Sequence, residues 1–140
     1  LEAMALSLGE YQGYVCPVMD ARRSQVYHAL FYVNHGSLER ITEDRAIPLA
    51  QLKQELAHLT EPMFLVGDGS VLTYKTLSGD IPNLAMPPEH RMHQRAAGAA
   101  LLAAQKQAAG ETGDGAALTP NYLRLSQAER ERLEREQQNS

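Results

Sequence analysis

The sequence has one cysteine, no excess of basic charge and no long apolar run. Cys16 alone cannot form an intramolecular disulfide, and its place in an apolar stretch predicts a packed thiol rather than a nucleophile. The formal net charge of −4 gives no uniform basic field, so this domain alone is not expected to bind nucleic acid regardless of sequence. No apolar run approaches the length of a membrane span, and no secretory signal opens the chain. These absences predict a soluble, cytoplasmic protein.

The 140 residues are enough for one domain with its own hydrophobic core. Residues 1–10 have the pattern of an amphipathic helix without an initiator methionine or a capping residue before it, which predicts a piece of a longer protein. Residues 11–125 are expected to form one lobe. Residues 126–140 have little apolar character, which predicts a polar helical or frayed tail.

The apolar pattern predicts strands and helices in a defined order. Strands are predicted at 14–19, 25–33, 37–46, 63–66 and 81–86. Helices are predicted over about 48–59, from 71 to 77, and from 92 to 110, where Ala96, Ala99 and Ala103 should let the helix lie close to a sheet. Pro17 has no amide proton to donate, so the first strand needs a bulge or an unpaired position there. The mostly polar third strand should lie at an edge.

This order predicts an α/β fold with a mixed five-stranded sheet and helices on both faces. Short turns join the first three strands, so these strands pair antiparallel. Helical crossovers join the later strands, so these are parallel. Such a sheet is the ribonuclease-H-like unit, which occurs twice in the two-lobed actin-like and sugar-kinase-like ATPases.

The run from Asp20 to Tyr27 places an acid and two arginines in a tight turn between two strands. In one interpretation Asp20 pairs with Arg22 or Arg23 and neutralises it; in the other these side chains bind a ligand directly. Two residues near the end of the chain, Tyr122 and Arg124, could join this group if their segment meets residues 20–27 in space. Arginine with tyrosine suits carboxylate, phosphate or partner-protein contacts, whereas Tyr122 could simply pack while Arg124 caps the sheet edge.

The run Gly67-Asp68-Gly69-Ser70 follows a buried strand and opens a helix, as in the adenosine-binding turn of actin-like ATPases. Asp68 would repel a phosphate, so a plain strand-to-helix turn is the stronger interpretation. Asp20 and Asp68 both follow strands, as metal-binding carboxylates do in ribonuclease-H-like nucleases, but no third acid completes a metal site. His90 and His93 could share a helix face but have no further zinc ligand nearby.

Three segments, in order along the chain, resemble motifs of the bacterial TsaB (YeaZ) family. Residues 15–27 resemble its "DAR…EVY" signature, with Gln25 where the family usually has Glu. Tyr122-Leu123-Arg124 after Pro120 resembles its "P-x-YLR" ending. Leu1-Glu2-Ala3-Met4-Ala5 resembles the "LEALA" helix between its two lobes. The resemblance covers the second lobe and the interlobe helix.

The resemblance implies a non-catalytic accessory subunit that supports a TsaD-like catalytic subunit in threonylcarbamoyl transfer to adenosine 37 of tRNA. It implies pairing with that subunit mainly through the first lobe, a TsaE-like ATPase as a further partner, and contact with tRNA only through the complex. It implies no metal and no cofactor for this domain, with ATP only in the full complex; a homodimer stays open. The older glycoprotease label has no support in these residues. The alternatives are a lobe of a sugar- or acid-kinase-like ATPase and a ribonuclease-H-like nuclease.

Overall fold

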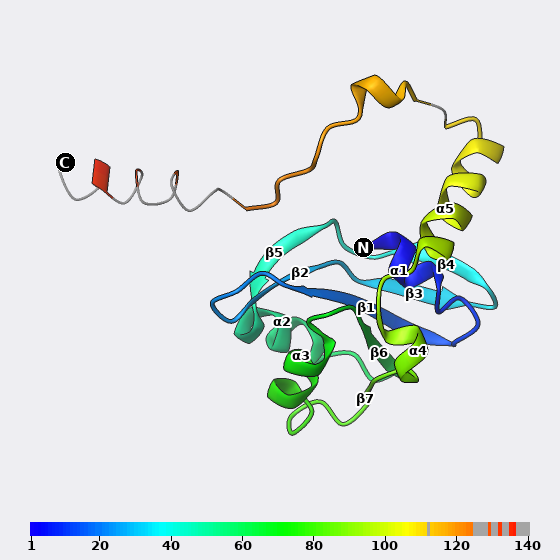
Figure 1. Ribbon diagram of the computed structural model, residues 1–140. Helices are drawn as coiled ribbons and strands as arrows, with labels where there is room; N and C mark the ends of the chain where they lie inside the picture. Colours follow the sequence, from blue (N-terminus) through cyan, green and yellow to red (C-terminus); the bar gives the residue numbers. More distant parts are fainter. Residues whose placement is uncertain (112, 125–128, 130–131, 133–134, 137–140) are drawn as a thin grey trace.

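The computed structural model describes residues 1–111, 113–124, 129, 132, 135 and 136. A twisted sheet lies between two helical layers, with α1 and α5 on one side and α2 and α3 on the other (Figure 1). The strands are β1 (Gly13–Asp20), β2 (Gln25–His28), β3 (Phe31–Asn34), β4 (Ser37–Arg40), β5 (Arg45–Pro48), β6 (Met63–Val66) and β7 (Leu84–Ala85). The helices are α1 (Glu2–Leu6), α2 (Leu49–Leu56), α3 (Ser70–Leu77), α4 (Glu89–Met92) and α5 (Ala96–Ala108), with a 3₁₀ turn at Gly115–Ala117.

Strand β1 lies at the centre of the sheet. It pairs antiparallel with β3 and then with β2 along one edge, and parallel with β6 along the other. β4 and β5 flank β3 and β2 on the outside, and β7 extends the sheet beyond β6 as a parallel neighbour. The predicted mixed sheet, with antiparallel leading strands and parallel later strands, is therefore confirmed. The predicted edge position of the third strand is also confirmed.

The prediction of five strands is wrong, because the second and third predicted strands each divide in two. Pro17 lies between the part of β1 that pairs with β3 and the part that pairs with β2. Opposite it the partner strand breaks at Ala29 and Leu30. The Leu30 amide donates instead to Thr42 Oγ1 at 2.8 Å, and the Leu30 carbonyl accepts from the Ile41 amide at 2.8 Å. Pro17 is thus unpaired on the side of β1 that faces β2 and β3, as predicted, while on the other side it pairs with Val66 of β6.

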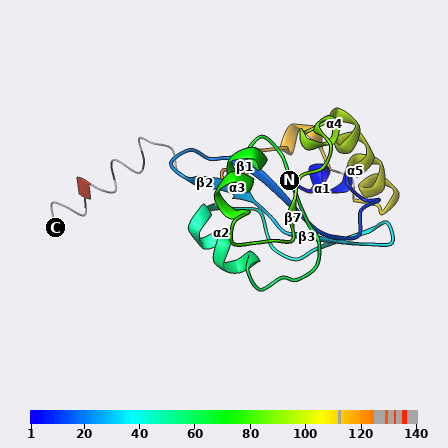
Figure 2. The same cartoon turned by 90° about the horizontal axis from the view of Figure 1, so that it is seen from below.

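The core lies on both faces of the sheet. On one face α2 and α3 pack through a cluster that includes Leu52, Leu56 and Leu77. On the other face α1 packs Met4 and Ala5 against the first strands. Figure 2 views the molecule from the side of α2 and α3, with α3 in front of the strands. The predicted helix at 48–59 and the predicted strand at 63–66 are both confirmed, the strand to the residue.

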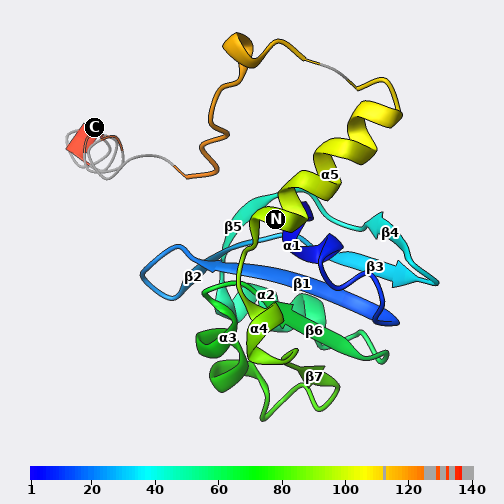
Figure 3. The same ribbon diagram turned by 45° about the vertical axis from the view of Figure 1, so that its right-hand side comes forward.

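The helix predicted from residue 92 to Gly110 is interrupted. α4 ends at Met92, whose carbonyl accepts from the Gly67 amide at 2.6 Å, and His93 to Arg95 run extended before α5 begins. The prediction that alanines place this helix close to a sheet is wrong. Ala96, Ala99 and Ala103 are exposed, and α5 instead packs against α1 (Figure 3).

Gly98 sets the distance between α5 and α1. It is the one buried residue of α5, and a Cβ at this position would collide with the Ala3 carbonyl oxygen. We expect Gly98→Ala to lower the free energy of unfolding by about 2 kcal/mol, because overpacking forces the helices apart. Urea unfolding measures the change. Gly79→Ala is the matched control, since no atom lies within 4 Å of its added Cβ. Equal stabilities for the two variants would contradict this account of the α1–α5 contact.

The remaining differences lie toward the end of the chain. The strand predicted at 81–86 is reduced to Leu84–Ala85, because Ile81, Pro82 and Asn83 form a turn in which the Leu84 amide donates to the Ile81 carbonyl. Most of the predicted tail, 126–140, lies outside the described residues. None of the helices in the described part of the chain is long and apolar enough to cross a membrane.

Candidate functional site

The turn between β1 and β2 has an unusual backbone. Arg22, Arg23 and Ser24 have φ angles of +64°, +53° and +56°. The Gln25 amide donates to the Arg22 carbonyl at 3.1 Å, which closes one left-handed turn. Left-handed backbone costs a residue with a side chain about 1–2 kcal/mol, whereas glycine adopts it freely. The turn therefore carries two arginine side chains where glycine would relieve backbone strain.

Asp20 organises the beginning of this turn. Its Oδ1 accepts from the Arg22 amide at 2.7 Å, and its Oδ2 lies 3.7 Å from the Arg22 guanidinium. The Arg22 side chain is 87% exposed, so water screens the ion pair and it contributes little to stability. The interpretation that Asp20 pairs with an arginine therefore holds for Arg22. In the described part of the chain Arg23 has no ion-pair partner.

The two motif segments meet in space. The Arg124 guanidinium donates to the Ala21 carbonyl, which fastens residues 121–124 to the β1–β2 turn. A cavity of about 200 Å³ lies between them. Its lining residues are Leu1, Met19, Tyr27, Asn121, Tyr122, Leu123 and Arg124. Tyr27 is half-buried and Tyr122 is 84% exposed, so Tyr122 does not pack as one interpretation expected.

Three backbone amides of the Gly67–Ser70 turn donate hydrogen bonds to carbonyls of the domain. The Gly67 amide donates to Met92, the Gly69 amide donates to the Val18 carbonyl at 3.1 Å, and the Ser70 amide donates to Gly67. The Ser70 hydroxyl also donates to the Gly67 carbonyl, at 2.7 Å. These groups are the ones that would otherwise point at a phosphate. This geometry favours the plain strand-to-helix turn, while a nucleotide contact at Gly67, Asp68 and Gly69 stays a prediction.

The structure places the Asp68 carboxylate at the backbone of Asp20. Asp68 Oδ1 accepts from the Asp20 amide at 3.2 Å. Among the described residues no group of three histidine, cysteine, aspartate or glutamate side chains could hold a metal ion. His90 and His93 are both exposed.

One buried polar pair has no counterpart in the sequence predictions. Cys16 Sγ on β1 lies 3.3 Å from His28 Nδ1 on β2, and both residues are fully buried. Burial raises the pKa of the Cys16 thiol, which therefore stays protonated at neutral pH and is a poor nucleophile. The predicted packed thiol is confirmed. The sequence did not reveal His28 as the partner of Cys16, because their contact depends on the register between β1 and β2.

Replacing Arg23 with glycine should stabilise the domain. We expect Arg23→Gly to raise the free energy of unfolding by about 0.5–1 kcal/mol, since relief of left-handed strain exceeds the greater flexibility of glycine in the unfolded chain. Urea unfolding measures the change. Lys75→Gly, an exposed position in α3, is the control with the opposite sign, expected to cost about 1 kcal/mol. A loss of stability in Arg23→Gly would show that the side chain holds the turn.

Comparisons with known proteins give a consistent result. No protein-family model matches the sequence. Over 135 residues the chain is 30% identical to "tRNA threonylcarbamoyladenosine biosynthesis protein TsaB" of Bacillus subtilis (strain 168), a match that covers 96% of this chain and 57% of that protein. The chain thus spans little more than half the length of its curated relative.

Two solved structures share the fold. The first, described as an uncharacterized protein with similarity to peptidase YeaZ from Pseudomonas aeruginosa, has a TM-score of 0.60 and 20% identity over 89% of this chain and 56% of its own. The second, YeaZ from Pseudomonas aeruginosa, has a TM-score of 0.56 and 18% identity over 87% of this chain and 56% of its own. The Bacillus match along nearly the whole sequence supports a member of the TsaB (YeaZ) family that covers part of the family's length, and the two structures share its fold.

Proposed function

We propose that the chain is the second lobe of a TsaB-like, non-catalytic accessory subunit. Its full-length protein would support a TsaD-like catalytic subunit in threonylcarbamoyl transfer to adenosine 37 of tRNA. The observation that carries this proposal is the 30% identity to the Bacillus protein over 96% of the chain. The order of the strands, with β1 between antiparallel and parallel neighbours, also agrees with a ribonuclease-H-like lobe of the actin-like type.

Two features of the site support a non-catalytic role. The Cys16 thiol is buried beside a neutral histidine, where no substrate can reach it. The Gly67, Gly69 and Ser70 amides donate to carbonyls of the domain itself, which weakens the kinase-like alternative. With Asp20 and Asp68 as the two neighbouring acids and Arg22 beside them, the nuclease alternative has an incomplete ligand set for a metal pair.

The same proposal covers domains, partners and location. Residues 1–10 would form the interlobe helix, residues 11–125 the lobe and residues 126–140 the tail. The catalytic subunit would be contacted mainly through the first lobe of the full-length protein, with a TsaE-like ATPase as a further partner and with tRNA bound only in the complex. The complex would be cytoplasmic.

Reconstitution tests the proposed function. The full-length protein is mixed with the TsaD-like and TsaE-like proteins, a labelled threonylcarbamoyl donor and tRNA, and the label on the tRNA is counted. We expect transfer to fall to background when the full-length protein is omitted. Transfer that is unchanged by the omission would reject the accessory role, and transfer by the protein without the catalytic subunit would reject the non-catalytic one.

A further inference from the structure

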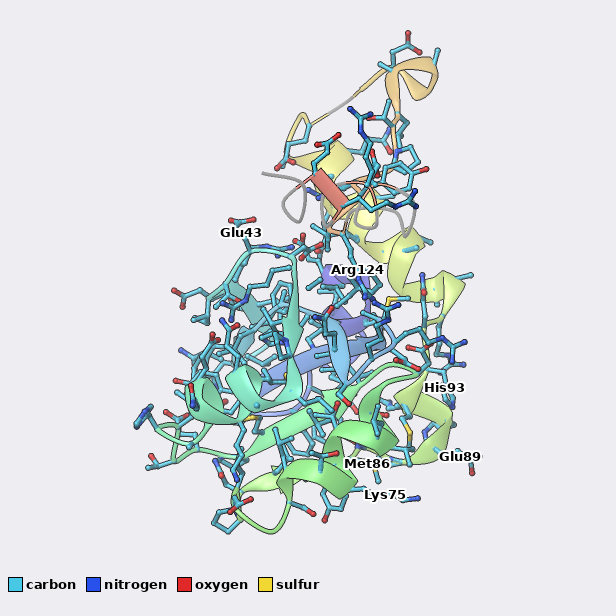
Figure 4. The ribbon with its side chains drawn as sticks, turned by 90° about the vertical axis from the view of Figure 1, so that its left-hand side faces the viewer. Glu43, Lys75, Met86, Glu89, His93 and Arg124 are labelled. Carbon is cyan, nitrogen blue, oxygen red and sulfur yellow. The ribbon has the colours of Figure 1, made fainter. Side chains whose placement is uncertain are left out.

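The β1–β2 turn and residues 121–124, which bond to it, form one surface, here called the arginine–tyrosine tip, on which Arg22, Arg23 and Tyr122 are exposed. Its members are Arg22, Arg23, Tyr27, Tyr122 and Arg124. Figure 4 shows Arg124 well apart from Lys75, which lies on α3. The tip carries three cations in a chain whose formal net charge is −4.

Nearby acids offset only part of the positive charge of the tip, which has three arginines against the two carboxylates of Asp20 and Asp68. The Asp20 carboxylate is already occupied by the Arg22 amide and lies 3.7 Å from the Arg22 guanidinium. Arg124 has a neutral partner, the Ala21 carbonyl, so its charge remains. Arg23 has no ion-pair partner in the described ranges. Arginine on a convex turn presents its guanidinium fork to an anion, and phosphate oxygens fit that fork.

Tyr122 gives the tip a second kind of binding surface. Its ring is 84% exposed and borders the cavity of about 200 Å³ that Tyr27 also lines. A cavity of roughly 150 Å³ holds a benzene ring, so this one has room for a planar base. Exposed aromatic rings beside arginines are typical of sites that stack unpaired bases and hold the adjoining phosphates.

We propose that the arginine–tyrosine tip binds single-stranded RNA, with the arginines on phosphates and a base stacked on Tyr122. The inference rests on the proposed function, in which the complex acts on a tRNA, and adds where this chain touches it. An acidic protein segment is the competing occupant. RNA fits better because the aromatic ring is open to solvent beside a convex basic turn, whereas protein anchors occupy closed, well-packed pockets. The strained turn keeps arginines where glycine would be more stable.

The test uses the full-length protein in complex with its catalytic subunit and an anticodon stem-loop RNA as the probe. Fluorescence anisotropy gives the affinity at several salt concentrations. We expect Arg23→Gly to weaken binding about tenfold and to reduce the slope of log K against log salt by about 0.7, the value for one lost phosphate contact on a single strand. We expect Tyr122→Ala to weaken binding about five- to hundredfold and to leave the salt slope nearly unchanged.

Lys75→Ala is the matched control, because it removes one exposed cation far from the tip, and it should leave both quantities unchanged. Affinities for Arg23→Gly and Tyr122→Ala equal to that of the control would overturn the proposal. Loss of the catalytic subunit from the variant complexes on gel filtration would also overturn it and assign the tip to a protein partner. Loss of affinity in Arg23→Gly alone would indicate a simple anion site and reject the stacked base. Wild-type reconstitution is scored separately, so failure of the tip and failure of the accessory role are distinguishable.

Discussion

Gly67→Ala should lower the free energy of unfolding by about 3 kcal/mol or more. Gly67 has a φ angle of +112°, where an alanine is strained by about 1–2 kcal/mol. A Cβ at this position would also collide with the Val18 carbonyl oxygen on β1, and such overpacking costs about 1–3 kcal/mol more. A domain with a total stability of about 5–15 kcal/mol would lose a large share of it.

Two other glycines separate the causes of this loss. Gly36 has a φ angle of +82° with no atom within 4 Å of an added Cβ, so Gly36→Ala tests backbone strain alone and should cost about 1 kcal/mol. Gly79 has neither constraint, so Gly79→Ala should be nearly neutral. Urea unfolding of the three variants gives the comparison. If Gly67→Ala costs no more than Gly36→Ala, the close approach of the turn to β1 is not what requires glycine.

Acid should destabilise the domain through His28. Burial, reinforced by the nearby positive charge of Arg45, lowers the pKa of His28 from 6.5 to about 4. The unfolded chain therefore binds a proton near pH 6.5, while the folded chain resists it until about pH 4. Stability is unaffected by this group above pH 6.5, falls as the pH drops from 6.5 to 4, and loses about 3 kcal/mol in total.

Urea unfolding at several pH values measures this effect. The charged groups around His28 are Arg45, Asp44 and Glu55, and the Cys16 thiol lies against its ring. Because acids also titrate below pH 5, the diagnostic range is pH 6.5 to 5. His28→Gln should flatten the dependence on pH in that range, although the variant is less stable throughout. His58→Gln removes an exposed histidine and should leave the dependence as it is. A slope that His28→Gln does not change would reject His28 as the cause.

Local pattern was enough to predict the elements but not their interruptions. Met63–Val66 is a short apolar run between clear turn residues, so its ends could be predicted to the residue. Pro17 indicated an unpaired position. The break at Ala29 and Leu30 could not be located, because it depends on Thr42, whose hydroxyl oxygen accepts the Leu30 amide from twelve residues away. Tertiary contacts of this kind leave no periodic pattern in the sequence.

For the candidate site, the sequence likewise predicted which segments take part but not the contacts and backbone angles that they have. Motif residues predicted that Asp20–Tyr27 and Tyr122–Arg124 could meet, and the Arg124 bond to Ala21 confirms it. The acceptor in that bond is a backbone carbonyl, which every residue has, so its position could not be predicted. The left-handed angles of Arg22 and Arg23 were also unexpected, since this conformation usually takes glycine or asparagine.

The break in the second and third strands gives the domain a line of flexure. On one side of Pro17, β3 bonds to the start of β1, β4 bonds to β3, and α1 packs against this half. On the other side, β2 bonds to the end of β1 and β5 bonds to β2. The two halves share β1 but no other ladder, so each can twist by its own amount. Arg124 is fastened to the second half. A partner that displaces residues 121–124 would therefore move the half formed by β2 and β5, and it would leave the half formed by β3, β4 and α1 in place.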